Sequence, residues 1–214
     1  MALLNDEMRE QLSGFFNGMK KDVTLAVFTT KEGCESCKDT EDFMEEMASL
    51  SDKIHFAAYD IDTHKDKAEA YGVTLTPSVV LLNSEQKHQG VKFNGIPAGH
   101  EVNSLIKGIM AVAGSLDTLP ESQQQRLKKV TKPVNIKVFV TLSCPHCPGA
   151  VEKAHQLALE NEHIDAEMIE AQTFSAVAEK FNVSSVPKVV INEKFEFVGN
   201  QTIDDFLSEI EKTQ

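Results

Sequence analysis

Two Cys-x-x-Cys pairs, Cys34–Cys37 and Cys144–Cys147, constrain this chain more than any other feature, because they contain all four of its cysteines. Each pair follows a strand-like apolar run and precedes a helix-like run. These runs span residues 23–29, 38–50, 134–141 and 150–160. A thiol in the first turn of a helix lies near the positive end of the helix dipole and near unpaired backbone N–H groups. Both favour the reactive thiolate, so the sequence predicts two thiol sites of the same construction.

The spacing within each pair suits thiol–disulfide exchange. Residues three apart on a helix share a face, so one cysteine can attack a disulfide while the other resolves the mixed intermediate. The alternative is a zinc-binding adaptor, because four thiolates can form a tetrahedral metal site. Zinc ribbons separate their pairs by about 15–20 residues, whereas 106 residues lie between Cys37 and Cys144. We therefore expect redox-active pairs and no metal ligands.

The chain has the form of an internal duplication. Cys34 and Pro77 are 43 positions apart, and so are Cys144 and Pro187. Strand-like and helix-like runs alternate in the same order in both halves, which predicts α/β units with a central sheet flanked by helices. We expect two units, which comprise residues 1–115 and 116–214.

Local signals predict how each unit begins. Residues 3–19 should form a helix with Asn5 as its N-cap. Its apolar stripe is expected to be core and consists of Leu4, Met8, Leu12, Phe15 and Met19. Thr118 and Glu121 fit a capping box, which predicts a second helix at the junction of the units.

Charge and composition narrow the range of partners. The chain has 214 residues and a net charge of −12, and both halves are acidic, so we expect neither nucleic acid nor membrane as a partner. It contains no apolar run of the roughly 18 residues that a transmembrane helix needs, and residues 1–12 are too charged for a signal peptide. These features indicate a cytoplasmic protein. Cytoplasmic thiols are kept reduced, so paired cysteines there indicate catalysis or metal binding rather than structural bridges.

The sequence resembles a known family at this point. A Cys-x-x-Cys pair before a helix, followed by Thr76-Pro77 or Val186-Pro187 before a strand, resembles the thioredoxin fold. Two such units in tandem are similar to the glutaredoxin-like protein disulfide oxidoreductases best known from thermophilic archaea and bacteria. The most specific segments are 95–101, 140–148 and 186–192. The second unit is also similar to the N-terminal domain of the flavoprotein subunit of alkyl hydroperoxide reductase, which has lost the first cysteine pair. No flavin-binding region is present in this chain.

The resemblance implies a set of site residues. In the family the proline is cis and lies beside the disulfide, which assigns Pro77 and Pro187 to the two sites. The preceding residues, Thr76 and Val186, would offer their backbone to an extended substrate chain. Cys34 and Cys144 would attack, and Cys37 and Cys147 would resolve.

The sequence departs from thioredoxin in one respect that matters for chemistry. Thioredoxin carries a buried aspartate six positions before its first cysteine, where this chain has Phe28 and Val138. The proton acceptor for the resolving cysteine is therefore not assigned by the resemblance. A nearby glutamate, lysine or water must take that role.

The residues within the two pairs indicate different redox properties. His146 lies next to Cys147 and close to Cys144, and an imidazole there favours the thiolate and an oxidising disulfide. Glu35 lies beside Cys34, and a carboxylate disfavours a second negative charge. We expect the second pair to be the more reactive. The alternative is that the geometry of the fold outweighs both neighbours.

Together these features predict a protein disulfide oxidoreductase that acts on protein disulfides and dithiols without a cofactor other than its cysteine pairs. The resemblance implies that a thioredoxin-reductase-like flavoprotein supplies electrons. An alternative within redox chemistry is an electron carrier to a peroxiredoxin.

Overall fold

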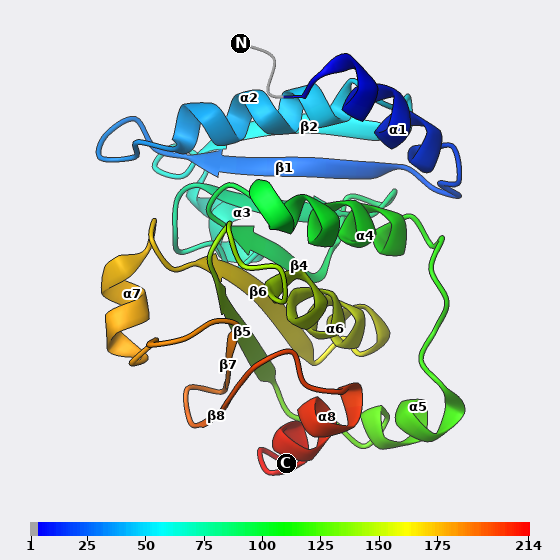
Figure 1. Cartoon of the computed structure of the whole chain (residues 1–214), viewed down its shortest axis with the longest axis vertical. Helices are drawn as coiled ribbons and strands as arrows, with labels where there is room; N and C mark the ends of the chain where they lie inside the picture. Colours follow the sequence, from blue (N-terminus) through cyan, green and yellow to red (C-terminus); the bar gives the residue numbers. More distant parts are fainter. Residues whose placement is uncertain (1–3) are drawn as a thin grey trace.

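The computed structural model describes residues 4–214 as one mixed eight-stranded sheet covered by helices (Figure 1). The strands are β1 Val23–Thr29, β2 Ile54–Asp60, β3 Ser78–Leu82, β4 His88–Asn94, β5 Val134–Val140, β6 Ile164–Glu170, β7 Lys188–Ile191 and β8 Phe195–Val198. Their order across the sheet is β2-β1-β3-β4-β6-β5-β7-β8. Strands β1–β4 belong to the first unit and β5–β8 to the second. In each unit the first two strands are parallel and the other two pair antiparallel, which confirms the predicted duplication.

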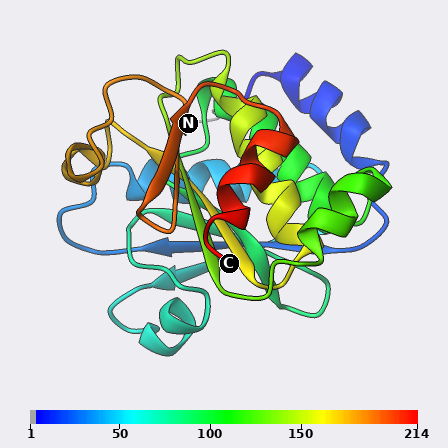
Figure 2. The same cartoon turned by 90° about the horizontal axis from the view of Figure 1, so that it is seen from below.

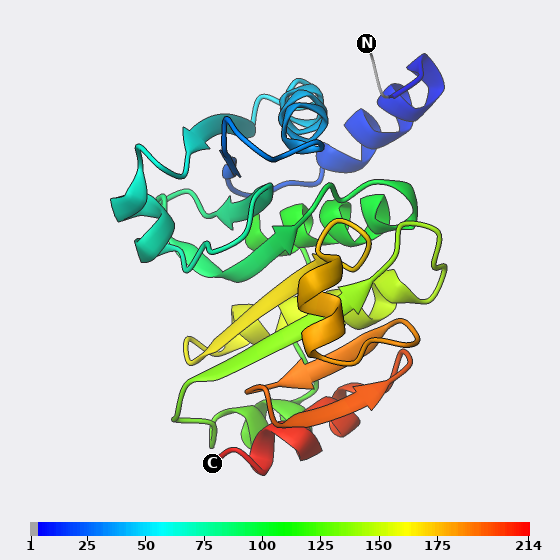
Figure 3. The same ribbon diagram turned by 90° about the vertical axis from the view of Figure 1, so that its left-hand side faces the viewer.

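The helices divide between the two faces of the sheet. They are α1 Asp6–Phe16, α2 Cys37–Ala48, α3 Lys65–Ala70, the 3₁₀ turn η1 Gly99–Glu101, α4 Val102–Val112, α5 Glu121–Leu127, α6 Cys147–Glu160, α7 Ser175–Lys180 and α8 Ile203–Glu211. Helices α2, α4, α6 and α8 contribute buried side chains to one large core. Helices α3 and α7 cover smaller clusters on the opposite face, where α7 lies in front of the sheet in Figure 3. No helix formed by residues 4–214 has the length and apolar character that a membrane crossing requires.

The two units are joined through both the sheet and the core. Strands β4 and β6 pair in parallel, with Phe93 opposite Met168. Helices α4 and α6 contact one another over this join, and the ring of His155 from α6 lies 4.8 Å from that of Phe93. Both views in Figures 1 and 2 show α4 beside α6. Because apolar burial is continuous across the join, the units form one body.

The first helix is partly as predicted. Asn5 is its N-cap and accepts a hydrogen bond from the backbone N–H of Met8. The predicted core stripe is wrong at Met8 and Phe15, which are 40% and 49% exposed. Helix α1 lies against α2 at the edge of the fold and is held by the ion pair between Arg9 and Glu46. Only one side of α1 is therefore covered.

The predicted capping box at the junction is also wrong, although the helix is present. Helix α5 begins after Pro120, whose backbone is extended. The N–H of Leu119 is bonded to the carboxylate of Glu160 on α6. This contact holds the segment around Leu119 extended, so Thr118 lies outside the helix.

Candidate functional site

Each cysteine pair forms a disulfide at the start of a helix. Cys37 is the first residue of α2 and Cys147 is the first residue of α6. They are bonded to Cys34 and Cys144, with Cα–Cα distances of 5.4 Å and 5.5 Å. In each pair the earlier cysteine is the more exposed, since Cys34 is half-buried and Cys144 is 9% exposed, against 6% for Cys37 and 0% for Cys147. This arrangement suits attack by the first sulfur and resolution by the second.

Both predicted cis prolines are confirmed. The Thr76-Pro77 and Val186-Pro187 peptide bonds are cis, and each precedes the strand that pairs antiparallel with β1 or β5. The Val186 carbonyl oxygen lies 3.9 Å from the Cys144 sulfur. Each cis proline is thus followed by a strand that pairs with the strand leading to a cysteine pair. At the second pair the backbone before the proline also contacts the first cysteine.

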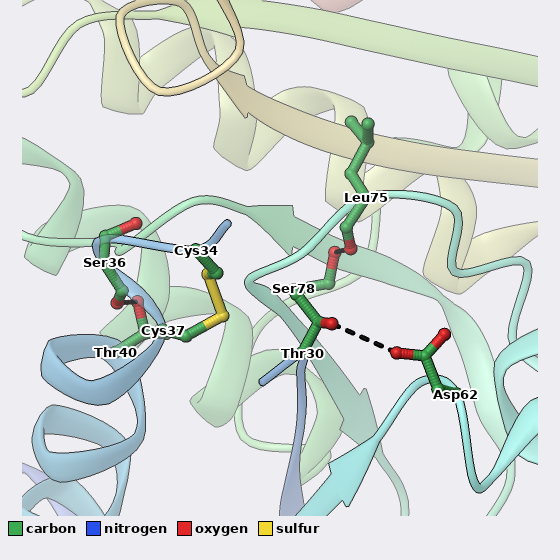
Figure 4. The surroundings of a disulfide bond; sticks show 8 residues. All are labelled: Thr30, Cys34, Ser36, Cys37, Thr40, Asp62, Leu75 and Ser78. Carbon is green, nitrogen blue, oxygen red and sulfur yellow. Dashed lines mark hydrogen bonds between the residues drawn. A yellow bond between two sulfur atoms is a disulfide. The ribbon is translucent and has the colours of Figure 1, made fainter. Parts of the chain in front are cut away.

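The surroundings of the first disulfide are largely polar (Figure 4). Leu75 and Ser78, which flank the cis proline, lie on one side of Cys34–Cys37 in Figure 4. Thr30, just after β1, donates a hydrogen bond of 3.1 Å to Asp62. The side chain of Asp62 is exposed to solvent and lies on the side of Thr30 away from the disulfide in Figure 4.

The second site is built from both units. The backbone N–H of His100, on η1, donates a hydrogen bond of 3.0 Å to the carbonyl of Leu142, two residues before Cys144. The neighbouring Gly99 has φ +58°, and a Cβ atom on it would lie 2.4 Å from the same oxygen. Only glycine permits this close approach. The segment between β4 and α4 therefore forms a wall of the second site.

Replacing Gly99 with alanine should lower the free energy of unfolding by about 2–3 kcal/mol, because the methyl group requires both a strained backbone and displacement of Leu142. It should also slow disulfide exchange at the second pair more than at the first. Urea unfolding and exchange assays measure these effects. Gly14→Ala is the control, since nothing lies within 4 Å of its Cβ position in α1, and alanine should be neutral or slightly stabilising there. Equal stability of the two variants would contradict the predicted contact.

Glu101 is a buried acid that sequence reasoning did not single out. Its side chain is fully buried on η1, which contacts α6. Burial raises the pKa of Glu101 to about 7, and the charge of Glu152 on α6 adds to this, although a hydrogen bond with Ser104 opposes it. Among the described residues its Oε1 atom has no hydrogen-bond partner. It ends the segment 95–101 that carries the family resemblance, but its burial could not be read from the sequence.

The remaining predicted residues are placed as follows. His146 precedes Cys147 at the N-cap position of α6 with an exposed side chain. Glu35 is likewise exposed between the cysteines of the first pair. Phe28 and Val138 are fully buried among apolar side chains, so the strand positions that hold an acid in thioredoxin hold none here.

The cysteines do not converge on one point. Within residues 4–214, no three His, Cys, Asp or Glu side chains are grouped so that they could hold a metal ion. Each cysteine is instead paired with its own neighbour. This arrangement does not fit the four-cysteine zinc adaptor, because such a site needs ligands from both pairs around one ion.

Comparison with known proteins agrees with this geometry. The thioredoxin family model matches residues 9–108, and a thioredoxin domain model matches residues 134–212. The chain is 26% identical to NADH dehydrogenase of Bacillus subtilis over 97% of its own length. It is 27% identical to the alkyl hydroperoxide reductase AhpF of Staphylococcus epidermidis over 99% of its length. In both cases the chain spans only 38% of the relative.

Two solved structures match over almost the whole chain. The alkylhydroperoxide reductase AhpF of Enterococcus faecalis is 34% identical, with a TM-score of 0.92, and the match covers 98% of this chain and 100% of that one. A protein disulfide oxidoreductase from Aeropyrum pernix is 31% identical, with a TM-score of 0.91, and the match covers 100% of this chain and 94% of that one. This chain therefore belongs to the thioredoxin-fold disulfide oxidoreductases, as a member with two tandem domains and a Cys-x-x-Cys disulfide in each.

Proposed function

We propose that this chain catalyses thiol–disulfide exchange on protein substrates through both cysteine pairs. The observation that carries the proposal is the position of each disulfide: at a helix N-terminus, with its first sulfur the more exposed and a cis-proline loop in the same unit. A helix N-terminus stabilises the thiolate of a reduced pair. We propose that the two units comprise residues 1–115 and 116–214. We also propose that they act in the cytoplasm, where thiols are kept reduced.

In the reductive direction, the thiolate of Cys34 or Cys144 attacks one sulfur of a substrate disulfide. A mixed disulfide forms and one substrate sulfur leaves as a thiolate. The thiolate of Cys37 or Cys147 then attacks the mixed disulfide and releases the second substrate sulfur. Two electrons pass from the cysteine pair to the substrate, and the two substrate thiolates take up protons.

The neighbouring residues support these steps. The backbone of Thr76 and Val186 would pair with an extended substrate chain, because these residues end the loops that lead into β3 and β7. At the second pair, His146 would stabilise the Cys144 thiolate.

We propose that Glu101 accepts the proton of Cys147 at the second site. It is a buried acid on η1, which contacts the helix that begins with Cys147, and its pKa of about 7 suits proton transfer near neutral pH. The strand positions that correspond to the buried aspartate of thioredoxin are Phe28 and Val138 in this chain, so another group must accept the proton of the resolving cysteine. At the first pair the structure offers no buried acid of this kind among the residues around the disulfide in Figure 4.

The similarity to redox proteins supports partners of a redox kind. A flavoprotein of the thioredoxin-reductase kind would return electrons to the pairs. A second candidate function, an electron carrier to a peroxiredoxin, is favoured by the similarity to the AhpF component of alkyl hydroperoxide reductase.

Two assays with matched variants test the proposal. The wild-type chain should accelerate the reduction of insulin by dithiothreitol, whereas a variant with all four cysteines replaced by serine should not. Absence of acceleration by the wild type would overturn the proposal. Peroxide turnover with a flavoprotein donor and a peroxiredoxin then tests the second candidate function.

A further inference from the structure

A chain of hydrogen bonds crosses the sheet from the first proline loop into the second unit. The hydroxyl of Ser78, the residue after Pro77, can donate its one proton to either of two acceptors, the carbonyl oxygen of Leu75, at 2.7 Å, or the Oδ1 atom of Asn94. The amide nitrogen of Asn94 donates a hydrogen bond of 2.7 Å to the carboxylate of Glu167, on β6. Ser78 and Asn94 are at most 1% exposed and Glu167 is 8% exposed. Because these groups are buried, water competes little for their hydrogen bonds.

Glu167 is fixed on its far side by the second unit. Its other carboxylate oxygen accepts hydrogen bonds from Asn135, at 3.1 Å, and from Lys137, at 3.0 Å. Both residues are on β5, and Lys137 is directly opposite Glu167 in the sheet register. They lie in the first half of β5, whereas Cys144 follows its other end. Glu167 is thus held in place by groups that have no part in the second cysteine pair.

A second contact links the same loop to β6. The ammonium group of Lys92, on β4, donates hydrogen bonds to the carbonyl oxygens of Tyr71, at 3.3 Å, and Gly72, at 2.7 Å. These residues begin the loop that ends at Pro77. Lys92 is also paired with Asp165, at 3.4 Å, and His88 donates to the same carboxylate at 2.9 Å. Burial acts to raise the pKa of Asp165, but the bond with His88 and the charge of Lys92 outweigh it and lower the pKa to about 2. Asp165 therefore stays charged.

The loop of the second site is held differently. Lys188 donates to the carbonyl oxygens of Phe181, at 2.7 Å, and Asn182, at 3.4 Å. Its carboxylate partner is Glu196, at 3.1 Å, which lies on β8 of the same unit. By the offset of 110 positions, Lys188 corresponds to Ser78. The second loop is therefore fixed from within its own unit, whereas the first depends on two carboxylates of the other unit.

We propose that Glu167 and Asp165 are positioning residues for the first site, which hold its substrate-binding loop although they belong to the second unit. The inference rests on the proposed function, because the loop matters through the Thr76 backbone that would pair with substrate. The second unit thereby contributes to peptide binding at the first cysteine pair without touching it. Loss of Glu167 leaves the buried amide of Asn94 without its acceptor, and Asn94 then no longer holds the hydroxyl of Ser78 in place.

The test uses two parent proteins, each with one cysteine pair replaced by serines. Glu167→Leu, of similar volume, removes the hydrogen bond to Asn94. Glu167→Gln can restore a bond to Asn94 if the side-chain amide of Asn94 flips, so that its oxygen faces the glutamine nitrogen. The substrates are a short peptide with one disulfide and a small aromatic disulfide that has no peptide backbone. In the parent that keeps Cys34 and Cys37, Glu167→Leu should raise the KM for the peptide about tenfold with kcat nearly unchanged. The rate with the aromatic disulfide should stay the same.

Three comparisons make the result decisive. Glu167→Gln should recover most of the peptide KM. In the parent that keeps Cys144 and Cys147, Glu167→Leu should leave the peptide KM within about twofold, which also shows that the variant is folded. Hydrogen exchange should become faster in residues 71–78 but not in residues 181–188.

An unchanged KM and unchanged exchange in residues 71–78 would overturn the inference, as would an equal rise in KM at both sites. If the first-pair parent reduces neither substrate, the proposed function fails at that site. Hydrogen exchange would then still show whether Glu167 holds the loop.

Discussion

Replacing Cys144 with serine should lower dithiothreitol-driven reduction of protein disulfides by about a hundredfold, whereas Cys34→Ser should leave substantial activity. The reason is that the second site combines more of the groups that the reaction needs. Its first cysteine has His146 as a neighbour, and the Val186 carbonyl lies 3.9 Å from its sulfur. Glu101, the proton acceptor proposed above for Cys147, is a buried acid. At the first pair Glu35 lies between the two cysteines, and its carboxylate disfavours a thiolate.

Steady-state rates for the two single variants measure this difference. Cys147→Ser is the matched control, because it keeps the attacking sulfur and should accumulate a mixed disulfide with substrate, detectable by mass spectrometry. The same measurements with a flavoprotein donor show whether the first pair relays electrons, in which case Cys34→Ser loses activity only there. Equal losses for Cys34→Ser and Cys144→Ser with dithiothreitol would mean that the pairs act as one coupled site.

Replacing Glu101 with glutamine should slow exchange at the second pair by about a hundredfold at pH 8, which is the lower end of the usual contribution of a general base. The wild-type rate should fall as the pH drops through about 7, because a protonated Glu101 cannot accept the proton of Cys147. Glutamine is isosteric with the protonated acid and does not titrate. The variant should therefore lose this step in the pH profile, which stopped-flow measurements in a protein that retains only the second pair would show.

The same substitution has an expected effect on stability. The pKa of Glu101 is raised from 4.5 to about 7 in the folded protein, so between these values the folded state holds a proton that the unfolded state has lost. Stability should then decrease as the pH rises through this window, by about 3–3.5 kcal/mol in all. Glu101→Gln removes this decrease and should be more stable than the wild type at pH 8, as measured by urea unfolding.

Glu152→Gln is the control for both effects. The charge of Glu152 adds to the raised pKa of Glu101, so its removal should shift the step in the rate profile to lower pH and retain activity. A wild-type profile that lacks a step near pH 7, or an unchanged profile in Glu101→Gln, would exclude Glu101 as the proton acceptor.

Most of the site could be predicted because its main parts are local in sequence. The position of each cysteine pair after an apolar strand places the sulfurs at a helix N-terminus, and helices α2 and α6 do begin at Cys37 and Cys147. The equal spacing from Cys34 to Pro77 and from Cys144 to Pro187 indicated equivalent loops, and both peptide bonds are cis. The predictions were wrong where an apolar pattern in the sequence is not covered by another element of the fold. The apolar stripe of α1 predicted core, yet Phe15 is 49% exposed, because α1 lies at the edge of the fold and is covered on one side only.

The sequence by itself therefore determined the duplication, the thioredoxin-like order of elements and the two cysteine pairs, since hydrophobic periodicity and short motifs encode all three. Only the tertiary structure decided how the units join. The pairing of β4 with β6 brings residues more than 70 positions apart into contact, as with Asn94 and Glu167. The same join places η1 of the first unit against the segment before Cys144 and buries Glu101. Burial and hydrogen-bond partners set the pKa of a side chain, and they arise from packing between distant segments, which no local pattern of residues records.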